Sequence, residues 1–234
     1  MKTQGQKIIR LAILLFITFL TTQCKKDKTI PVFVTDIDGN VYHTITIGNM
    51  VWLKENLRTG RYRNGDVIPN VTDTAQWTTN NAGVWCYYRN LPSNNSTYGK
   101  LYNWYAVSDL RNIAPAGWHV ASEFEWINLT KALGSDSIAG GKLKETGTLH
   151  WAFPNLGATN AINFTALPGG CLAGGYPFTF NGIGQYGNWW TSMSVWFSDY
   201  NDAYARGISF NACCCNEGKA IKTWGLSVRC VMDY

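Results

Sequence analysis

PAGWHVASEFEW, residues 115–126, is the stretch of this 234-residue chain that says most about its fold. It contains a strong helix-start signal, because Ser122 and Glu125 stand at the spacing of a capping box. Apolar residues follow as far as Leu133, and a glycine after them predicts the end of the helix. Trp118 precedes the start of the predicted helix and Trp126 follows it. Both stand beside aliphatic residues, a setting typical of buried aromatic side chains. We expect the same of Trp52 and Trp104, which lie in similar surroundings.

Short strands are predicted on both sides of this helix. Upstream, residues 34–37 and 41–47 enclose Asp38-Gly39-Asn40, and an Asp-Gly turn between β-rich runs predicts a hairpin. A calcium loop is the weaker interpretation, since its later ligands are missing. Residues 101–107 are expected to be helical, and a second helix is expected near 137–144. Further strands are predicted at residues 164–167, 189–193, 203–210 and 226–232. The chain is therefore expected to be an α+β domain with small antiparallel sheets, two helices and long irregular loops.

The N-terminus predicts export. Three positive charges precede an apolar run at residues 11–20, which has the length of a signal sequence and is too short to span a bilayer comfortably. The run breaks into TTQC and then CKKD, a pattern that favours lipoprotein processing with Cys24 as the acylated N-terminus. A plain secretory signal with an incidental Cys24 is the alternative. The predicted divisions are a signal peptide at 1–23, a tether at 24–34 and one domain at 35–234.

This reading implies a protein of the cell envelope whose partner is a membrane, held through the N-terminal lipid. Removing residues 1–23, which carry three positive and no negative charges, lowers the formal net charge from +5 to +2. A protein with so little positive charge and no basic stripe is not expected to bind nucleic acid. The remaining residues fit one domain, whose core is large enough to be stable without disulfide bonds or a structural metal ion.

A series of short motifs centred on Trp and Gly follows in a fixed order along the chain. In sequence they read TDIDGNVYHTITIGNMVWLKENL (35–57), IPNVTD (68–73), YGKLYNWYAV (98–107), PAGWHVASEFEW (115–126), AGGKLKETGTLHW (139–151), GATN (157–160), FTALPGG (164–170), GNWWTS (187–192) and GLSVRCV (225–231). This series resembles the Fibrobacter succinogenes major paralogous domain, found in secreted and surface proteins of Fibrobacter and Bacteroidetes-type bacteria. The resemblance implies a C-type-lectin-like fold, related to that of sulfatase-modifying, formylglycine-generating enzymes. It implies no particular reaction.

The cysteines admit two interpretations. Outside Cys24, an even number of cysteines in an oxidising compartment favours disulfides, whose pairing the sequence does not reveal. Relatives commonly carry a cysteine before the PxGWHV motif, and the resemblance implies that it pairs with the cysteine of the last strand, but this chain has Ala114 there. The resemblance to formylglycine-generating enzymes raises the rival hypothesis of a copper(I)-thiolate oxidase, although the cysteine spacing differs. The candidates for a disulfide or thiol cluster are Cys171, Cys213, Cys214, Cys215 and Cys230.

Ligand binding is expected in the Gly- and Asn-rich segment from about 171 to 200, because loops carry function more often than frameworks do. The candidate ligand-binding aromatic residues are Tyr186, Trp189, Trp190, Trp196 and Tyr200. The calcium-dependent sugar signatures of animal lectins are absent, and the sequence predicts no catalytic residue, metal site or cofactor.

Three classes of function remain open. The first is a surface binding or adhesion module, with polysaccharide as the candidate ligand. The second is the copper-thiol oxidase, and the third is a passive envelope component. Fold alone does not choose among them.

Overall fold

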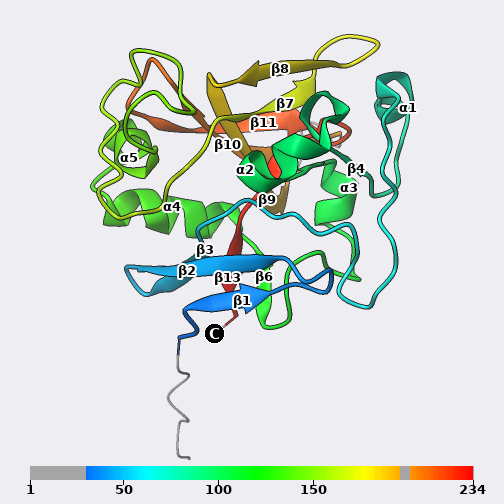
Figure 1. Ribbon diagram of the computed structural model, residues 1–234, viewed down its shortest axis with the longest axis horizontal. Helices are drawn as coiled ribbons and strands as arrows, with labels where there is room; N and C mark the ends of the chain where they lie inside the picture. The colour runs from blue at the N-terminus through cyan, green and yellow to red at the C-terminus, as the bar shows by residue number, and fades with distance from the viewer. Residues whose placement is uncertain (1–29, 196–200, 234) are drawn as a thin grey trace, which may run out of the picture.

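The computed structural model describes residues 30–195 and 201–233, which form two main sheets with short helices between and beside them (Figure 1). The five-stranded sheet has the order β1 (Phe33–Thr35), β2 (Val41–Ile47), β3 (Met50–Leu53), β13 (Cys230–Met232) and β6 (Trp118–Val120). The six-stranded sheet has the order β11 (Cys215–Ile221), β10 (Asp202–Ser209), β9 (Tyr186–Ser194), β7 (Gly169–Ala173) and β8 (Thr179–Ile183), with β12 (Ser227–Val228) paired to β9. A two-stranded sheet joins β4 (Trp85–Cys86) to β5 (Leu101–Tyr102).

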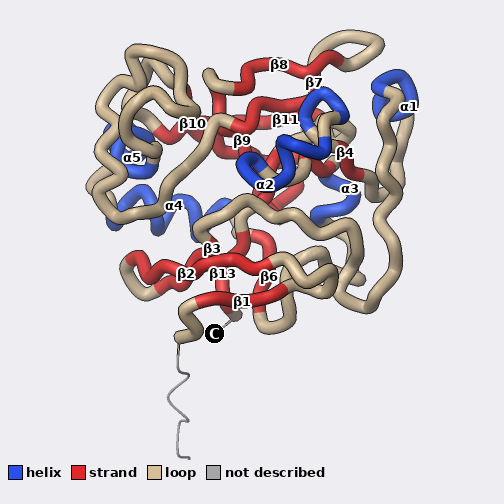
Figure 2. Tube along the Cα trace, in the orientation of Figure 1, coloured by secondary structure: helices blue, strands red, loops and turns tan. Residues whose placement is uncertain are grey.

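The helices are short. They are α1 (Thr74–Thr78), α2 (Asn95–Tyr98), α3 (Trp104–Val107), α4 (Glu123–Ala132) and α5 (Asp136–Leu143), with two 3₁₀ turns at Tyr88–Asn90 and Pro92–Asn94. Figure 2 shows α4 and α5 together on one side of the molecule, where α4 contacts β9 and β10 and α5 contacts β11. In the described part of the chain, no helix has the length and apolar character needed to cross a bilayer. The molecule is thus a mixed α and β structure built mostly from curled antiparallel sheets.

The predicted hairpin is confirmed. Strands β1 and β2 pair antiparallel, with Thr35 opposite Val41. Inside the turn, the Asp36 carboxylate accepts hydrogen bonds from the backbone N–H groups of Asp38 and Asn40 and from the Tyr42 hydroxyl. Protein donors therefore occupy the carboxylate that a calcium loop would offer to the ion.

The main helix starts where the sequence predicts. The Ser122 hydroxyl accepts the N–H of Glu125 at 3.3 Å, and the Glu125 carboxylate accepts the N–H of Ser122 at 2.7 Å, which completes the capping box. In α5, the glycine pair allows close packing. A Cβ at Gly140 would lie 2.1 Å from the Cys214 carbonyl oxygen, so a side chain there would push α5 off the neighbouring loop.

Two predicted elements differ from the structure. Residues 101–107 are not one helix but strand β5 followed by α3, because the Asn103 side chain caps the helix by accepting the N–H of Ala106. Residues 164–167 form no strand. Asn163 and Thr165 have φ values of 56° and 53°, which interrupt an extended backbone, and only Ala166 makes an isolated bridge.

Tryptophan rings fill the space between the sheets. Trp52 and Trp126 are fully buried with ring centroids 5.1 Å apart, and Trp189 joins them at 5.8 Å from Trp126. Trp118 is also buried, whereas Trp104 is half-buried. Strand β13 lies between β3 and β6, so the closing motif of the chain completes the sheet that the opening hairpin begins.

Candidate functional site

The aromatic residues predicted to bind ligand do not form one surface. Trp189 and Trp190 have 0 % exposure, and their indole N–H groups donate to Asn56 Oδ1 at 2.8 Å and to the Tyr102 carbonyl at 2.7 Å. Neither ring is available to a ligand. Tyr186, at the start of β9, is 43 % exposed. The remaining two candidates, Trp196 and Tyr200, lie outside the described residues.

A groove does lie next to this segment, on the face of the six-stranded sheet that is turned away from α4 and α5. Its floor follows from strand register. Gly207 of β10 is opposite Asn188 of β9 and Asn216 of β11, so the two amides flank a position without a side chain. In the next row of this face, Ala205 is opposite Gly218. Between the two amide side chains, the surface of the sheet therefore carries only glycine and alanine and is flat.

Apolar, aromatic and charged residues line the rest of the groove. Cys171, Trp224 and Leu226 line the groove, whose volume is about 170 Å³. Trp224 is half-buried, and its indole nitrogen is buried without an acceptor among the described residues. The side-chain amides of Asn188 and Asn216 also make no hydrogen bond to another described residue. Unused amide donors and acceptors beside an aromatic wall suit a neutral ligand rich in hydroxyl groups.

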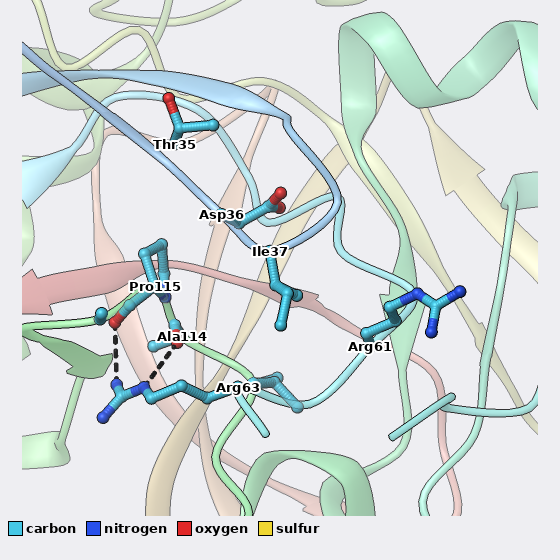
Figure 3. Close-up of a pocket in the computed structure, with 9 residues that line it drawn as sticks. Thr35, Asp36, Ile37, Arg61, Arg63, Ala114 and Pro115 are labelled. Atoms are coloured by element: carbon cyan, nitrogen blue, oxygen red, sulfur yellow. Dashed lines mark hydrogen bonds between the residues drawn. The ribbon is translucent and has the colours of Figure 1, made fainter. Parts of the chain in front are cut away.

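A second pocket, of about 220 Å³, lies beside the opening hairpin (Figure 3). Its two arginines point in opposite directions in Figure 3, and each is used by the fold. Arg63 donates to the carbonyl oxygens of Ala114 and Pro115 at 3.2 and 2.8 Å. Arg61 pairs with Asp38 at 3.2 Å. This pocket therefore offers a ligand little free hydrogen-bonding capacity.

The candidate cysteines are distributed over separate regions, and all those described are free thiols. Cys171 lies in the groove, whereas Cys213 and Cys214 precede β11 beside α5. Cys215 and Cys230 are buried in different core clusters. Burial raises the pKa of Cys171 to about 11 and that of Cys215 to about 12, which disfavours the thiolate that copper(I) requires.

The histidines likewise stand apart, each beside a carboxylate. His43 contacts Glu55, His150 contacts Glu145, and His119 lies between Glu125 and Asp233. The hydrogen bond to Glu125 raises the pKa of His119 to about 9, so this side chain is a protonated link between β6, α4 and the C-terminus. Among the described residues, no group of three or more His, Cys, Asp or Glu side chains is arranged to hold a metal ion.

Sequence reasoning did not single out Asn188, Asn216, Gly207 or Trp224. Asn188 lies in the GNWWTS motif, where the adjacent tryptophans are the more conspicuous signal, and the others fall in segments without a motif of their own. Only the pairing of β9, β10 and β11 brings them to one face.

Comparison with known proteins places the chain in a family. No curated protein and no solved structure matches it. The family model of the Fibrobacter succinogenes major domain matches residues 45–232, which is most of the chain and includes the whole six-stranded sheet and the five-stranded sheet from within β2 onward. The chain belongs to the Fibrobacter succinogenes major domain family.

Proposed function

We propose that this protein is a lipid-anchored module of the cell envelope that binds neutral polysaccharide in the groove over β9, β10 and β11. The observation that carries the proposal is the row formed by Asn188, Gly207 and Asn216, in which two unpaired amides flank an open floor. We also propose that the fold is of the C-type-lectin-like kind, as the family resemblance implies.

The two amides favour a sugar as the ligand, and the charged residues that also line the groove include both signs, Glu217 and Lys219. An amide offers both a donor and an acceptor, which matches the hydroxyl groups of a neutral sugar. Glycine and alanine on the floor let a flat ring approach the sheet. Trp224 supplies an aromatic wall, and contacts of this kind contribute on the order of 1 kcal/mol each. Binding by one domain should be weak once association costs are included. Retention on a polymer would then come from many copies on one membrane.

The position of the groove agrees with anchoring through Cys24. The described chain begins at residue 30, just before β1, and Figure 1 shows β1 at the lower end of the molecule and β11 in its upper part. A lipid attached six residues before Ile30 would hold the β1 end near the bilayer, because six residues span at most roughly 21 Å. The strands that carry the groove would then lie on the far side of the molecule from the membrane.

The test fills the groove without disturbing the fold. A Cβ at Gly218 would meet only the Ala205 carbonyl oxygen, at 3.9 Å, and the φ of this glycine is outside the left-handed region. Gly218→Leu should therefore fold and block the floor. Gly175→Leu is the matched control, since a Cβ there meets nothing within 4 Å and Gly175 does not line the groove. Both changes are made in the full chain carrying Cys24→Ser, which keeps it free of lipid.

Binding is measured on a glycan array and by retention on insoluble cellulose, xylan and chitin. We expect Gly218→Leu to abolish retention and Gly175→Leu to keep it. Asn188→Ala with Asn216→Ala should weaken binding about 10- to 30-fold, at roughly 1 kcal/mol for each hydrogen bond lost. If Gly218→Leu binds as well as its parent, or if the parent binds no glycan, the proposal is wrong.

A further inference from the structure

Arg229 is a buried cation whose partners are all neutral. It is 1 % exposed, and among the described residues it forms no ion pair with a carboxylate. Its Nε donates to Asn56 Oδ1 at 2.8 Å, and its Nη1 donates to the carbonyl oxygens of Leu53, at 2.9 Å, and Lys54. Burial pushes the pKa of Arg229 downward, since nothing close by neutralises the charge. The free energy of burying this charge is therefore only partly offset by hydrogen bonds.

One end of the guanidinium is poorly satisfied, and Arg229 lines a pocket. Nη2 has a single acceptor, the Thr165 carbonyl oxygen, at 3.5 Å. The pocket has a volume of about 150 Å³ and is lined by Arg229, Lys54, Thr97 and Thr165, among others. Among the described residues, the ammonium group of Lys54 and the hydroxyl of Thr97 have no hydrogen-bond partner. Three donors, two of them cationic, thus border one small opening.

The pocket also contains Glu55, whose carboxylate is already engaged. Its two oxygens accept from the Nδ1 and the backbone N–H of His43, at 2.7 and 2.8 Å. Glu55 therefore acts on Arg229 only from a distance. A buried lysine in the same protein provides a contrast. Lys144 has three acceptors at 2.8 to 2.9 Å for its three N–H groups, so its hydrogen bonding is complete.

We infer that this pocket, named here the Arg229 pocket, binds a small ligand through a carboxylate group. A carboxylate offers two oxygens in one plane, which matches the forked donors of an arginine. One oxygen would accept from Nη2 of Arg229 and the other from Lys54 or Thr97. The volume limits the ligand to the size of acetate or a single acidic sugar. The Arg229 pocket is separate from the groove over β9 to β11, and this inference does not depend on polysaccharide binding there.

The test titrates the full chain carrying Cys24→Ser with sodium acetate and, separately, sodium D-glucuronate. The readouts are the melting temperature and the NMR resonance of the Arg229 Nε–H group. D-glucose provides an uncharged control, sodium chloride at equal ionic strength controls for screening, and sodium phosphate tests another class of anion. The variant is Lys54→Gln with Thr97→Val, two half-exposed positions whose replacement leaves the core intact. Lys131→Gln, on the exposed side of α4, is the matched loss of charge.

We expect saturable shifts of the Arg229 resonance with acetate and glucuronate and none with glucose or chloride. The apparent Kd should rise at least tenfold in Lys54→Gln with Thr97→Val and stay unchanged in Lys131→Gln. Shifts that match those of chloride, or that survive the double variant, would overturn the site. Saturable binding of phosphate without binding of acetate would overturn the assignment to a carboxylate.

Discussion

Replacing Glu123 with glutamine is expected to destabilise the fold strongly. The expected loss is larger than that for an exposed carboxylate in the first turn of a helix. The side chain is buried and accepts from Nε and Nη2 of Arg206, whose side chain has 0 % exposure. The variant keeps the shape of the side chain and removes its charge. Arg206 would then remain buried without its main counter-ion.

The magnitude follows from the surroundings of the pair. Removing one partner of a buried ion pair costs about 3 to 5 kcal/mol. Asp136 Oδ1 lies 3.5 Å from Arg206 Nη1 and offsets part of this loss, although its side chain is 56 % exposed. We therefore expect the low end, about 3 kcal/mol. At about 2 to 4 °C for each kcal/mol in a domain of this size, the melting temperature should fall by roughly 6 to 12 °C.

The assay is urea unfolding followed by tryptophan fluorescence, with calorimetry for the melting temperature. Asp136→Asn is the control, because it removes the exposed carboxylate on the same arginine and should cost no more than about 1 kcal/mol. The double variant Glu123→Leu with Arg206→Met should recover most of the loss, since no buried charge remains. If Glu123→Gln costs no more than Asp136→Asn, the argument from burial is refuted.

Four further results are expected. His119 has a pKa of about 9 in the folded state, above its ordinary value, so its contribution to stability should be full below about pH 6.5 and should disappear as the pH rises through 9. His119→Gln should cost about 1 kcal/mol at low pH, because the group is partly exposed. The variant should also flatten the pH profile of stability measured by urea unfolding. Cys24→Ser should abolish lipid labelling and move the protein to the soluble fraction, and unchanged membrane retention would contradict the lipid anchor. Deleting residues 225–234 removes β12 and β13 and should abolish the cooperative thermal transition, whereas a sharp transition would show that the closing strand is dispensable. Cys230 is fully buried, which raises the pKa of its thiol, so it should react with a thiol reagent only after unfolding.

Local signals in the sequence were sufficient for several elements. The Asp-Gly turn predicts the β1–β2 hairpin, and the capping box predicts the start of α4 at the residue where the helix begins. Both depend on hydrogen bonds between residues a few positions apart, so they can be read from one segment. The strand predicted at 164–167 failed because Asn163 and Thr165 adopt left-handed conformations, which residue type alone does not reveal.

Much of the candidate site depended on contacts between distant segments. The sequence predicts ligand binding at about residues 171–200 and names Trp189 and Trp190 as candidates, but the fold uses both as core. A tryptophan in a Gly-rich segment can be exposed or buried, and contacts with distant segments decide which: Trp189 packs against Trp126 of α4, and Trp190 lies in the cluster that contains Tyr102 of β5.

The sequence by itself determined the family, the opening hairpin and the main helix, because each is encoded by neighbouring residues or by an ordered series of motifs. Only the tertiary structure decided which polar groups are left for a ligand. Asn188 and Asn216 flank Gly207 through the register of three strands, and Arg229 faces a pocket with Lys54 only because β13 inserts beside β3. Strand register and burial are properties of the whole packed chain, since each is set by contacts between residues far apart in sequence.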